Sequence, residues 1–290
     1  MKNVGFIGLG NMGSKMAINL AKSGYNVFGF DIDEKLVDKL SHLGITKVQS
    51  LSNFAKDKDI LITMLPNGNI VEKVLNEVLN DMEKSTVFLD CSTIDVKTVV
   101  KLNSISLLKG ISFIDAPVSG GTIGAENATL TFMVGGEESI FKLLSPLFNI
   151  MGSKSVYCGN SGSGQAAKLC NNMLLAITMI GVSEAFNMAK NLNLDLNTLF
   201  EVISTATGSC WAVNNYCPIP SVGPISPADN NYLAGFSAKL MSKDLKLAVN
   251  AGKESNSNIN FGEMAEKLFT QMANGENSHR DFSGIIEEIK

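Results

Sequence analysis

Residues 1–162 are predicted to form a doubly wound, mainly parallel α/β sheet, and residues 163–290 to form an all-helical C-terminal domain. Three observations lead to this fold class. Short β-rich runs alternate with helical patterns through the first 160 residues, which is typical of βαβ units. A glycine cluster directly follows the first β-rich run. After Gly162 the β-rich runs stop, and long helical patterns take their place.

The elements of the first domain are read from these runs. Strands are expected at residues 3–8, 26–31, 59–65, 86–91, 112–116, 130–134 and 155–158. Helices are expected between them, among them residues 12–22, 34–42, 70–80 and 96–108. Several of the strands are unbroken apolar runs rather than alternating ones, which predicts that helices cover both faces of the sheet.

The second domain is expected to be built around one long helix. Residues 164–191 are apolar on nearly every side, which predicts a buried spine or part of a subunit interface. Further helices are expected at residues 197–205, 238–252, 259–274 and 282–289. Residues 212–231 hold four of the seven prolines of the chain and predict an irregular loop. Its aromatic neighbours indicate an ordered loop with a role in substrate binding or in an interface.

Composition excludes several classes of function. With 24 basic and 28 acidic residues the net charge is -4, which gives no electrostatic footprint for nucleic acid. Only two histidines occur, His42 and His279, so a histidine-based zinc site or a Ser-His-Asp triad is not expected, and no metal is predicted. Five cysteines without a C-x-x-C pair favour free thiols in a reducing compartment.

The most apolar region, residues 173–188, is interrupted by polar side chains, and we expect no membrane span. The first residues run straight into the glycine cluster and show no targeting signal. The expected location is therefore the cytoplasm, or the mitochondrial matrix if the chain is eukaryotic and has lost a presequence.

Residues 8–13 match the pattern G-x-G-x-x-G between a strand and a helix. Gly8 permits a tight turn, Gly10 lets the backbone approach a pyrophosphate, and Gly13 lets helix and strand pack closely. Asn11 and Met12 complete the turn, and the helix that follows presents free N–H groups to phosphates. This context predicts a Rossmann-type dinucleotide site. The alternative is a glycine-rich turn that binds nothing.

Asp31 ends the second expected strand, 23 positions after Gly8. A carboxylate there can accept hydrogen bonds from both ribose hydroxyls of NAD and would repel the 2′-phosphate of NADP. The alternative is that Asp31 or Asp33 only caps the next helix. Asp33 directly precedes Glu34 and suits that cap better, so we predict NAD as the cofactor.

Lys168 and Asn172 lie four positions apart near the start of the long helix, and they therefore share one face. A desolvated lysine exchanges protons near neutral pH, as oxidation of an alcohol requires. Asn172 could hold a substrate hydroxyl or orient the amine. The alternative is a lysine whose amine reaches solvent and an asparagine bound to backbone. The spacing alone leaves both interpretations open.

Further loops are expected at the carboxyl ends of strands, where ligands bind in open α/β sheets. Ser119, Gly120 and Gly121 follow a strand and offer successive N–H groups and a hydroxyl to an anion. This pattern is also common in ordinary turns. The residues expected to face one crevice are Gly10, Leu65, Pro66, Thr93 and Ser119. Lys243 and Asp244 lie on an expected helix, and such a pair is most often on a solvated face.

Taken together, the motifs resemble the β-hydroxyacid dehydrogenase family over essentially the whole chain. They are Gly-Phe-Ile-Gly-Leu-Gly-Asn-Met-Gly from residue 5, Asp-Ala-Pro-Val-Ser-Gly-Gly from residue 115, Gly-Ser-Gly-Gln-Ala-Ala-Lys-Leu-Cys-Asn-Asn from residue 162 and Leu-Met-Ser-Lys-Asp-Leu from residue 240. The segment from Cys210 to Phe236 looks most like the members that act on 3-hydroxyisobutyrate. Ile70 departs from relatives that carry a polar residue near the cofactor.

The resemblance implies a role for each motif. Lys168 would be the catalytic acid/base, assisted by Asn172. Ser119 and Gly120, with Gly121 beside them, would hold the substrate carboxylate. The remaining implied cofactor residues are Leu65, Pro66, Thr93, Phe236 and Lys243, of which Lys243 would also reach the substrate.

The resemblance also implies an activity and an assembly. The expected reaction is the NAD-dependent oxidation of 3-hydroxyisobutyrate, a small 3-hydroxy acid, to methylmalonate semialdehyde by a homodimer or homotetramer. One alternative is a reductase of the same family that acts on tartronate semialdehyde or glyoxylate. An alternative of another class is a catalytically silent dinucleotide sensor, which would have no need of Lys168 and Asn172.

Overall fold

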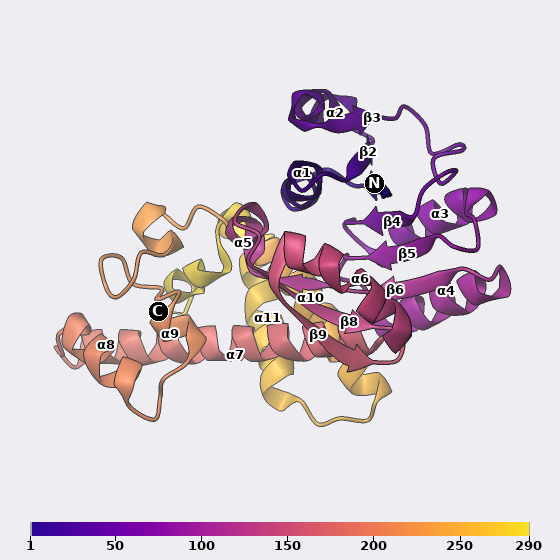
Figure 1. Ribbon diagram of the computed structural model, residues 1–290. Coiled ribbons are helices and arrows are strands. Elements are labelled where there is room, and N and C mark those ends of the chain that lie inside the picture. The colour runs from indigo at the N-terminus through magenta and orange to yellow at the C-terminus, as the bar shows by residue number, and fades with distance from the viewer. Residues whose placement is uncertain (1, 290) are drawn as a thin grey trace. The chain divides into compact units, whose positions relative to one another are not determined.

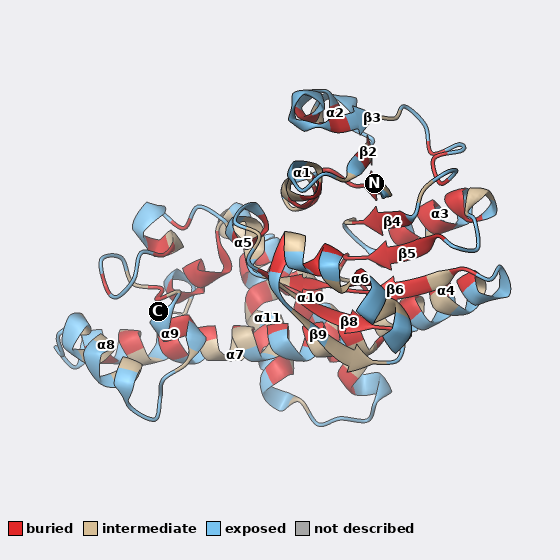
Figure 2. Cartoon of the chain, in the orientation of Figure 1, coloured by how far each residue is buried: buried red, intermediate tan, exposed pale blue. Residues whose placement is uncertain are grey.

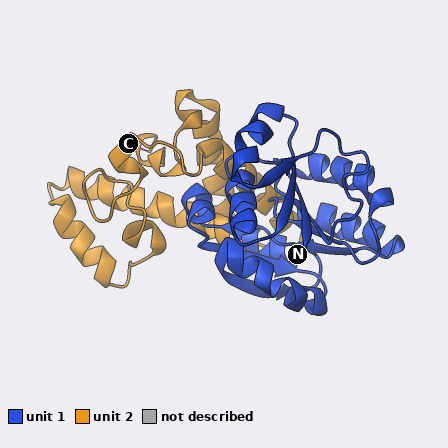
Figure 3. Ribbon diagram, turned by 45° about the horizontal axis from the view of Figure 1, so that its top comes forward, with its two compact units in different colours: residues 1–168 blue, residues 169–290 orange. Residues whose placement is uncertain are grey.

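The computed structural model describes residues 2–289 and divides into two compact units, residues 1–168 and 169–290 (Figure 3). The division falls inside the long helix α7 (Ser163–Asn191) instead of before it. The reason is local, because the first turn of α7 is hydrogen-bonded to the first unit through Asp115. Each unit has its own hydrophobic core.

The first unit contains a nine-stranded, mainly parallel sheet with the strand order β3-β2-β1-β4-β5-β6-β8-β7, in which β9 pairs with β8 (Figure 1). The strands are β1 (Asn3–Ile7), β2 (Asn26–Phe30), β3 (Ile45–Lys47), β4 (Ile60–Thr63), β5 (Val87–Asp90), β6 (Ser112–Asp115), β7 (Val118–Ser119), β8 (Leu130–Gly135) and β9 (Gly152–Gly159). The run from β3 to β6 is parallel, whereas β8 is antiparallel to β6 and β7. The predicted doubly wound sheet is therefore confirmed.

Helices pack on both faces of this sheet. They are α1 (Gly13–Lys22), α2 (Glu34–Leu40), α3 (Gly68–Val78), α4 (Val96–Leu108), α5 (Gly121–Glu126) and α6 (Glu138–Met151). One apolar cluster joins α1 and α6 to the strands, and a second joins α3 and α4 to them. Strands β4 and β5 are buried at every position (Figure 2), which explains their unbroken apolar sequences.

The second unit is helical. Its elements after α7 are α8 (Leu196–Thr205), α9 (Trp211–Asn214), α10 (Ala238–Glu254) and α11 (Asn260–Asn274), with short 3-10 helices at Pro227–Asn230, Glu276–His279 and Phe282–Glu287. Within residues 169–289 no strand is assigned, and one isolated bridge joins Ser237 to Asp281. The segment expected as a helix at residues 282–289 is a short 3-10 helix that ends at Glu287.

Helix α7 is buried on one side and exposes apolar side chains on another, and the two alternatives predicted for it were a buried spine and part of a subunit interface. Leu174 and Met188 are exposed, while Ala176, Met179 and Phe186 lie in the core. Among the described residues, α7 alone is long and apolar enough to cross a membrane, with a mean hydropathy of 1.4 over its most apolar window. The helix also supplies several core residues of the second unit, as expected of the central helix of a folded domain.

Candidate functional site

The glycine turn between β1 and α1 has the geometry of a phosphate-binding loop. Gly8 has φ of +93°, and a Cβ added at Gly13 would lie 1.9 Å from the Gly8 carbonyl oxygen. A Cβ at Gly10 would meet nothing within 4 Å, so this part of the backbone is open to a ligand. Helix α1 has no side-chain cap at Met12 and no acidic residue in its first turn. Its N-terminal N–H groups are therefore suited to binding phosphate.

Asp31 lies directly beside this turn. The Leu9 N–H donates to Asp31 Oδ2 at 2.7 Å, and the Asp33 N–H donates to Asp31 Oδ1 at 2.9 Å. Asp33 caps α2 by accepting from the Lys35 N–H, as its position before Glu34 predicted. Asp31 is thus engaged by two backbone donors, but a carboxylate oxygen has further lone pairs for ribose hydroxyls. The residues of the turn fit a nicotinamide dinucleotide.

A buried polar network joins the carboxyl ends of β4 and β5. The Thr63 hydroxyl donates to Asp90 Oδ1 at 2.7 Å, and the Ser92 N–H donates to the same oxygen at 3.1 Å. The Leu65 N–H donates to Ser92 Oγ at 2.9 Å. Burial raises the pKa of Asp90 to about 6. The network fixes the two loops that carry Leu65 with Pro66 and Thr93, all of them expected cofactor residues.

Helix α7 is anchored to the same edge of the sheet. Asp115, at the end of β6, accepts from the N–H groups of Gly162 and Gln165 at 2.8 and 3.0 Å. The side chain of Gln165 donates to the Ser92 carbonyl at 2.7 Å and accepts from the Ile94 N–H at 3.1 Å. Burial raises the pKa of Asp115, while the backbone donors oppose that shift. These bonds hold the first turn of α7 against the loop that contains Thr93.

Lys168 follows Gln165 by three positions on α7, and its side chain is buried, with 7% of its surface exposed. It therefore does not extend into bulk water. Its role as the residue that accepts or donates a proton stays a prediction.

Asn172, one turn further along α7, belongs to a second buried group. Its Nδ2 donates to Asp244 Oδ2 at 2.6 Å, and Lys243 Nζ lies 3.3 Å from Asp244 Oδ1. Asn171 donates in turn to the side-chain oxygen of Asn172 at 3.1 Å. Asp244 is only 2% exposed. The sequence-based view of Lys243 and Asp244 as a solvated pair is therefore wrong, because Asp244 is on a buried face of α10 and accepts a hydrogen bond from Asn172.

Ser119, Gly120 and Gly121 form the turn between β7 and α5. Gly120 has φ of +131° and Gly121 φ of +62°, which are conformations that side chains rarely adopt. Gly120 directly precedes α5 and gives it no side-chain cap. Gly120 is exposed and Ser119 and Gly121 are partly exposed, so the turn is accessible to a small ligand. Its role in holding a carboxylate stays a prediction.

Phe236 lies in the second unit, immediately before the Ser237 cap of α10. Its N–H donates to Asp281 Oδ2 at 3.0 Å, and its ring packs edge-on against Phe282 at 5.9 Å. The structure thus groups the expected site residues in two sets. One set, with the glycine turn and Lys168, is in the first unit, and the other, with Asn172, Lys243 and Phe236, is in the second.

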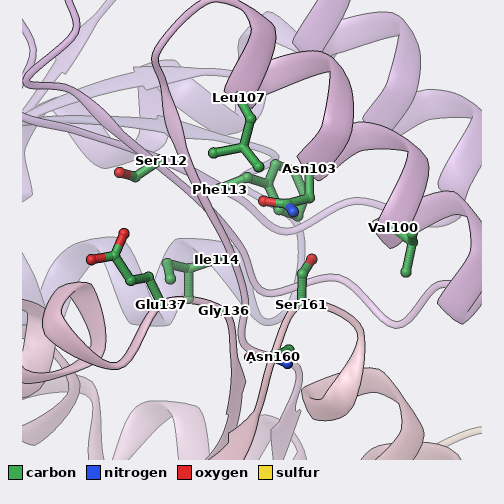
Figure 4. A pocket seen from close by; sticks show the side chains of 10 residues that line it. All are labelled: Val100, Asn103, Leu107, Ser112, Phe113, Ile114, Gly136, Glu137, Asn160 and Ser161. Atoms are coloured by element: carbon green, nitrogen blue, oxygen red, sulfur yellow. The ribbon is translucent and has the colours of Figure 1, made fainter.

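A pocket of about 410 Å³ in the first unit contains none of the expected site residues (Figure 4). It is lined by Val100, Asn103 and Leu107 of α4, by β6, and by the turns at Gly136 and Ser161. The buried Ser161 Oγ has no hydrogen-bond partner among the described residues. In residues 2–289 no group of three or more His, Cys, Asp or Glu side chains is placed to hold a metal ion.

Several residues of the site were missed from the sequence. From the sequence, Asp90 is expected only within the strand at residues 86–91, Asp244 is expected on a solvated face, and no role is expected for Ser92 or Gln165. A signal was available for Asp90 and Asp115, because both are acidic residues that end apolar strand sequences. Asp244 lies in the motif from residue 240, but its role could not be predicted, since its partner Asn172 lies 72 positions away.

Comparison with known proteins agrees with this geometry. Residues 3–159 match the family model of the NAD-binding domain of 6-phosphogluconate dehydrogenase, and residues 162–289 match the model described as NAD-binding of NADP-dependent 3-hydroxyisobutyrate dehydrogenase. A nicotinamide dinucleotide is therefore the cofactor of this fold.

Named relatives are similar over the full length. The mitochondrial 3-hydroxyisobutyrate dehydrogenase of Drosophila melanogaster is 47% identical over 100% of this chain and 90% of its own. The human mitochondrial enzyme of that name is 41% identical over 99% of this chain and 86% of its own. The solved structure of Mycobacterium tuberculosis 3-hydroxyisobutyrate dehydrogenase with L-serine is 40% identical, has a TM-score of 0.96, and is matched over 100% of this chain and 99% of its own. The chain therefore belongs to the 3-hydroxyisobutyrate dehydrogenase family of oxidoreductases.

Proposed function

We propose that the protein oxidises 3-hydroxyisobutyrate to methylmalonate semialdehyde with NAD. The observation that carries the proposal is the buried Lys168, held one turn after Gln165 at the sheet edge that also carries the glycine turn. The names of relatives that are 40–47% identical over the whole chain support the substrate. Because Asp31 adjoins the glycine turn, a carboxylate is placed where the 2′-phosphate of NADP would be repelled.

The residues of the chain divide the work of the reaction. Ser119 and the N–H groups of Gly120 and Gly121 bind the substrate carboxylate, which fixes the orientation of a small molecule. Lys168 Nζ, in its neutral form, takes the proton of the substrate hydroxyl as the C–O double bond forms. Bound NAD supplies the acceptor for the hydride that leaves the same carbon. In the reverse direction the ammonium of Lys168 returns the proton to the carbonyl oxygen.

Asn172 supports this proton transfer. Its Nδ2 donates to Asp244, and its side-chain oxygen accepts from Asn171 and has a second lone pair for another donor. Asn172 and Lys168 are one helical turn apart on α7, so the two side chains project from one face. We propose that Asn172 holds the substrate hydroxyl and that Lys243 contacts both cofactor and substrate.

Substitution of Lys168 tests the chemistry. The Lys168→Ala variant is expected to lose at least about 100-fold in kcat, the usual contribution of a general base, while its affinity for NADH changes little. Lys190→Ala is the matched control, because Lys190 is an exposed lysine on the same helix. Wild-type turnover by Lys168→Ala would falsify the assignment.

A substrate panel tests the specificity. Values of kcat/KM for 3-hydroxyisobutyrate, D-glycerate and glycolate, each with NAD and with NADP, should be highest for 3-hydroxyisobutyrate with NAD. A higher value with D-glycerate or glycolate would assign the protein to reduction of tartronate semialdehyde or glyoxylate instead.

We also infer a homodimer or homotetramer. Large apolar side chains are exposed on α7 and α11, including Leu174, Met188, Phe261 and Met264. Contiguous exposed apolar patches mark contact surfaces, and we infer that these side chains contribute to such a patch. Light scattering coupled to size exclusion should give two or four times the mass of 31.0 kDa. A monomer at micromolar concentration would contradict the inference.

The five cysteines are all free, and Cys91 and Cys217 are buried. Free thiols are typical of reducing compartments, and we propose the cytoplasm or the mitochondrial matrix as the location. Imaging of the tagged chain in its own cells would distinguish the two.

A further inference from the structure

Asp281 is a buried carboxylate in the second unit, far along the chain from Lys168. It accepts hydrogen bonds from five donors. Its Oδ2 accepts from the N–H groups of Gly235 and Phe236, both at 3.0 Å, and from the Tyr216 hydroxyl at 3.1 Å. Its Oδ1 accepts from the N–H of Ser283 at 3.0 Å and from its hydroxyl at 2.8 Å. Asp281 is 0% exposed, its two bonds from Ser283 are buried, and its three bonds from Gly235, Phe236 and Tyr216 are partly buried.

Backbone bonds join the same segments. The Asp281 N–H donates to the Tyr232 carbonyl at 2.8 Å, and the Phe282 N–H donates to the Phe236 carbonyl at 2.9 Å. The Ala238 N–H, the first of α10, donates to the Arg280 carbonyl at 2.9 Å. Residues 280–283 therefore run beside residues 232–238 and fix where α10 begins.

The loop bound in this way is strained. Tyr232 has φ of +56°, an unusual conformation for a bulky side chain, and Asn231 before it has φ of +47°. Such a conformation persists only where the surroundings hold it in place. The Tyr232 hydroxyl donates to the Pro218 carbonyl at 2.9 Å, which supplies one restraint. The side chain and backbone of Asp281 supply others.

Aromatic rings extend the same cluster to the proline-rich loop. Tyr216 stacks on Phe282 with ring centres 5.4 Å apart, and Trp211 stacks on Tyr216 at 5.0 Å. Phe236 meets Phe282 edge-on. Asp281 thus binds two residues of this cluster, Tyr216 through its side-chain hydroxyl and Phe236 through its backbone N–H.

We propose that Asp281 is a positioning residue, which holds Phe236 and the first turn of α10 in the arrangement that cofactor binding requires. Helix α10 carries Lys243 and Asp244, and Asp244 binds Asn172, so the start of α10 sets the position of these groups. A buried carboxylate is costly in free energy, and an apolar side chain would fill the same volume at lower cost. The cost is offset by the bonds from two loop N–H groups and a hydroxyl, which only an acceptor can bind.

The proposal rests on the proposed function, in which Lys243 contacts the cofactor, and on the family resemblance, which implies that Phe236 contacts it too. It is tested by a double-mutant cycle in which NADH affinity is measured for Asp281→Asn, Phe236→Ala and the double variant. Asp281→Asn is expected to weaken NADH about tenfold, the effect of losing a hydrogen bond to a charged group. If Asp281 acts through Phe236, the double variant binds NADH no more weakly than Phe236→Ala.

Two further variants guard against loss of folding. Tyr216→Phe removes one bond to Asp281 Oδ2 with little change in packing, and we expect it to weaken NADH about threefold. Ser283→Ala removes a bond to Oδ1, on the side away from the loop, and should leave the affinity unchanged. Trp211 is the only tryptophan of the chain, so a shift in its emission reports displacement of Tyr216.

The outcomes separate the two proposals. Additive losses in the cycle, or an equal loss of affinity in Ser283→Ala and Tyr216→Phe, would show that Asp281 only stabilises the fold and would overturn the inference. If the wild-type protein binds NADH but oxidises none of the hydroxy acids, the proposed function fails while the cycle still decides the role of Asp281. A wild-type protein that does not bind NADH overturns both.

Discussion

Ionisation of Asp90 should make the protein less stable as the pH rises. Asp90 is 0% exposed, and its Oδ2 has no hydrogen-bond partner among the described residues. Burial raises its pKa from 3.8 to about 6, although the bonds from Ser92 and Thr63 to the carboxylate oppose the shift. The negative charge of Asp115, its register neighbour on β6, raises the pKa further.

The sign of the effect follows from proton binding. Between about pH 4 and pH 6 the folded protein holds a proton at Asp90 that the unfolded chain has lost, so stability falls as the pH rises through this window. A shift of about two pKa units corresponds to about 3 kcal/mol in total. Between about pH 4.5 and pH 7.5, the contribution of Asp90 to the free energy of unfolding should fall by about 2 kcal/mol.

The Asp90→Asn variant isolates this contribution, because its side-chain carbonyl can still accept from Thr63 and Ser92 but cannot ionise. Urea unfolding, followed by circular dichroism across this pH range, should show the variant gaining about 2 kcal/mol relative to wild type as the pH rises. Thr63→Val should extend the window to higher pH, because it removes a bond that favours the charged form. A difference between Asp90→Asn and wild type that is flat with pH would refute the reasoning.

Three further substitutions test the site. Asp31→Ala should raise KM for NAD about tenfold and reduce discrimination against NADP, since it removes an acceptor and a negative charge; an unchanged NAD to NADP ratio of kcat/KM would leave Asp31 only structural. Gly13→Ala should weaken NADH more than about tenfold in fluorescence titration, because its Cβ would lie 1.9 Å from the Gly8 oxygen. Asp244→Ala should lower kcat about tenfold with little change in NADH affinity, because Asn172 loses its partner; equal loss in both measurements would contradict this.

Most of the first unit was predictable because its strands are continuous apolar runs between helical patterns. Helix α4 has the predicted bounds, Val96–Leu108, and the predicted strands agree with β1, β2 and β6 to within one residue. Strands β3 and β7 were missed because they contain only three and two residues, too few to show a pattern. The bounds of helices α5 and α6 were not predicted from the sequence, and α6 includes an interior proline, Pro146.

The candidate site was predictable to the extent that its residues lie within continuous motifs. Spacings of at most 23 residues predict the glycine turn, Asp31 and the pair of Lys168 and Asn172. The strands and helices next to these residues can also be predicted from the sequence. The structure places the turn beside Asp31 and buries Lys168. Which residues hold these groups could not be predicted, because Gln165 binds the loop at 92–94, more than 70 positions away.

The residues missed from the sequence share a physical property, since each is polar, buried and bonded to a distant segment. Sequence patterns report which positions are apolar, and a polar side chain within them is read by default as solvent-exposed. Asp244 and Asp281 show why that default fails, because both lie in helical or loop sequences rich in polar residues and yet are buried. A buried carboxylate is stable only when donors surround it, and those donors become known only once the chain has folded. Functional groups within continuous sequence motifs can therefore be found from the sequence. The buried polar groups that orient them are found from the structure.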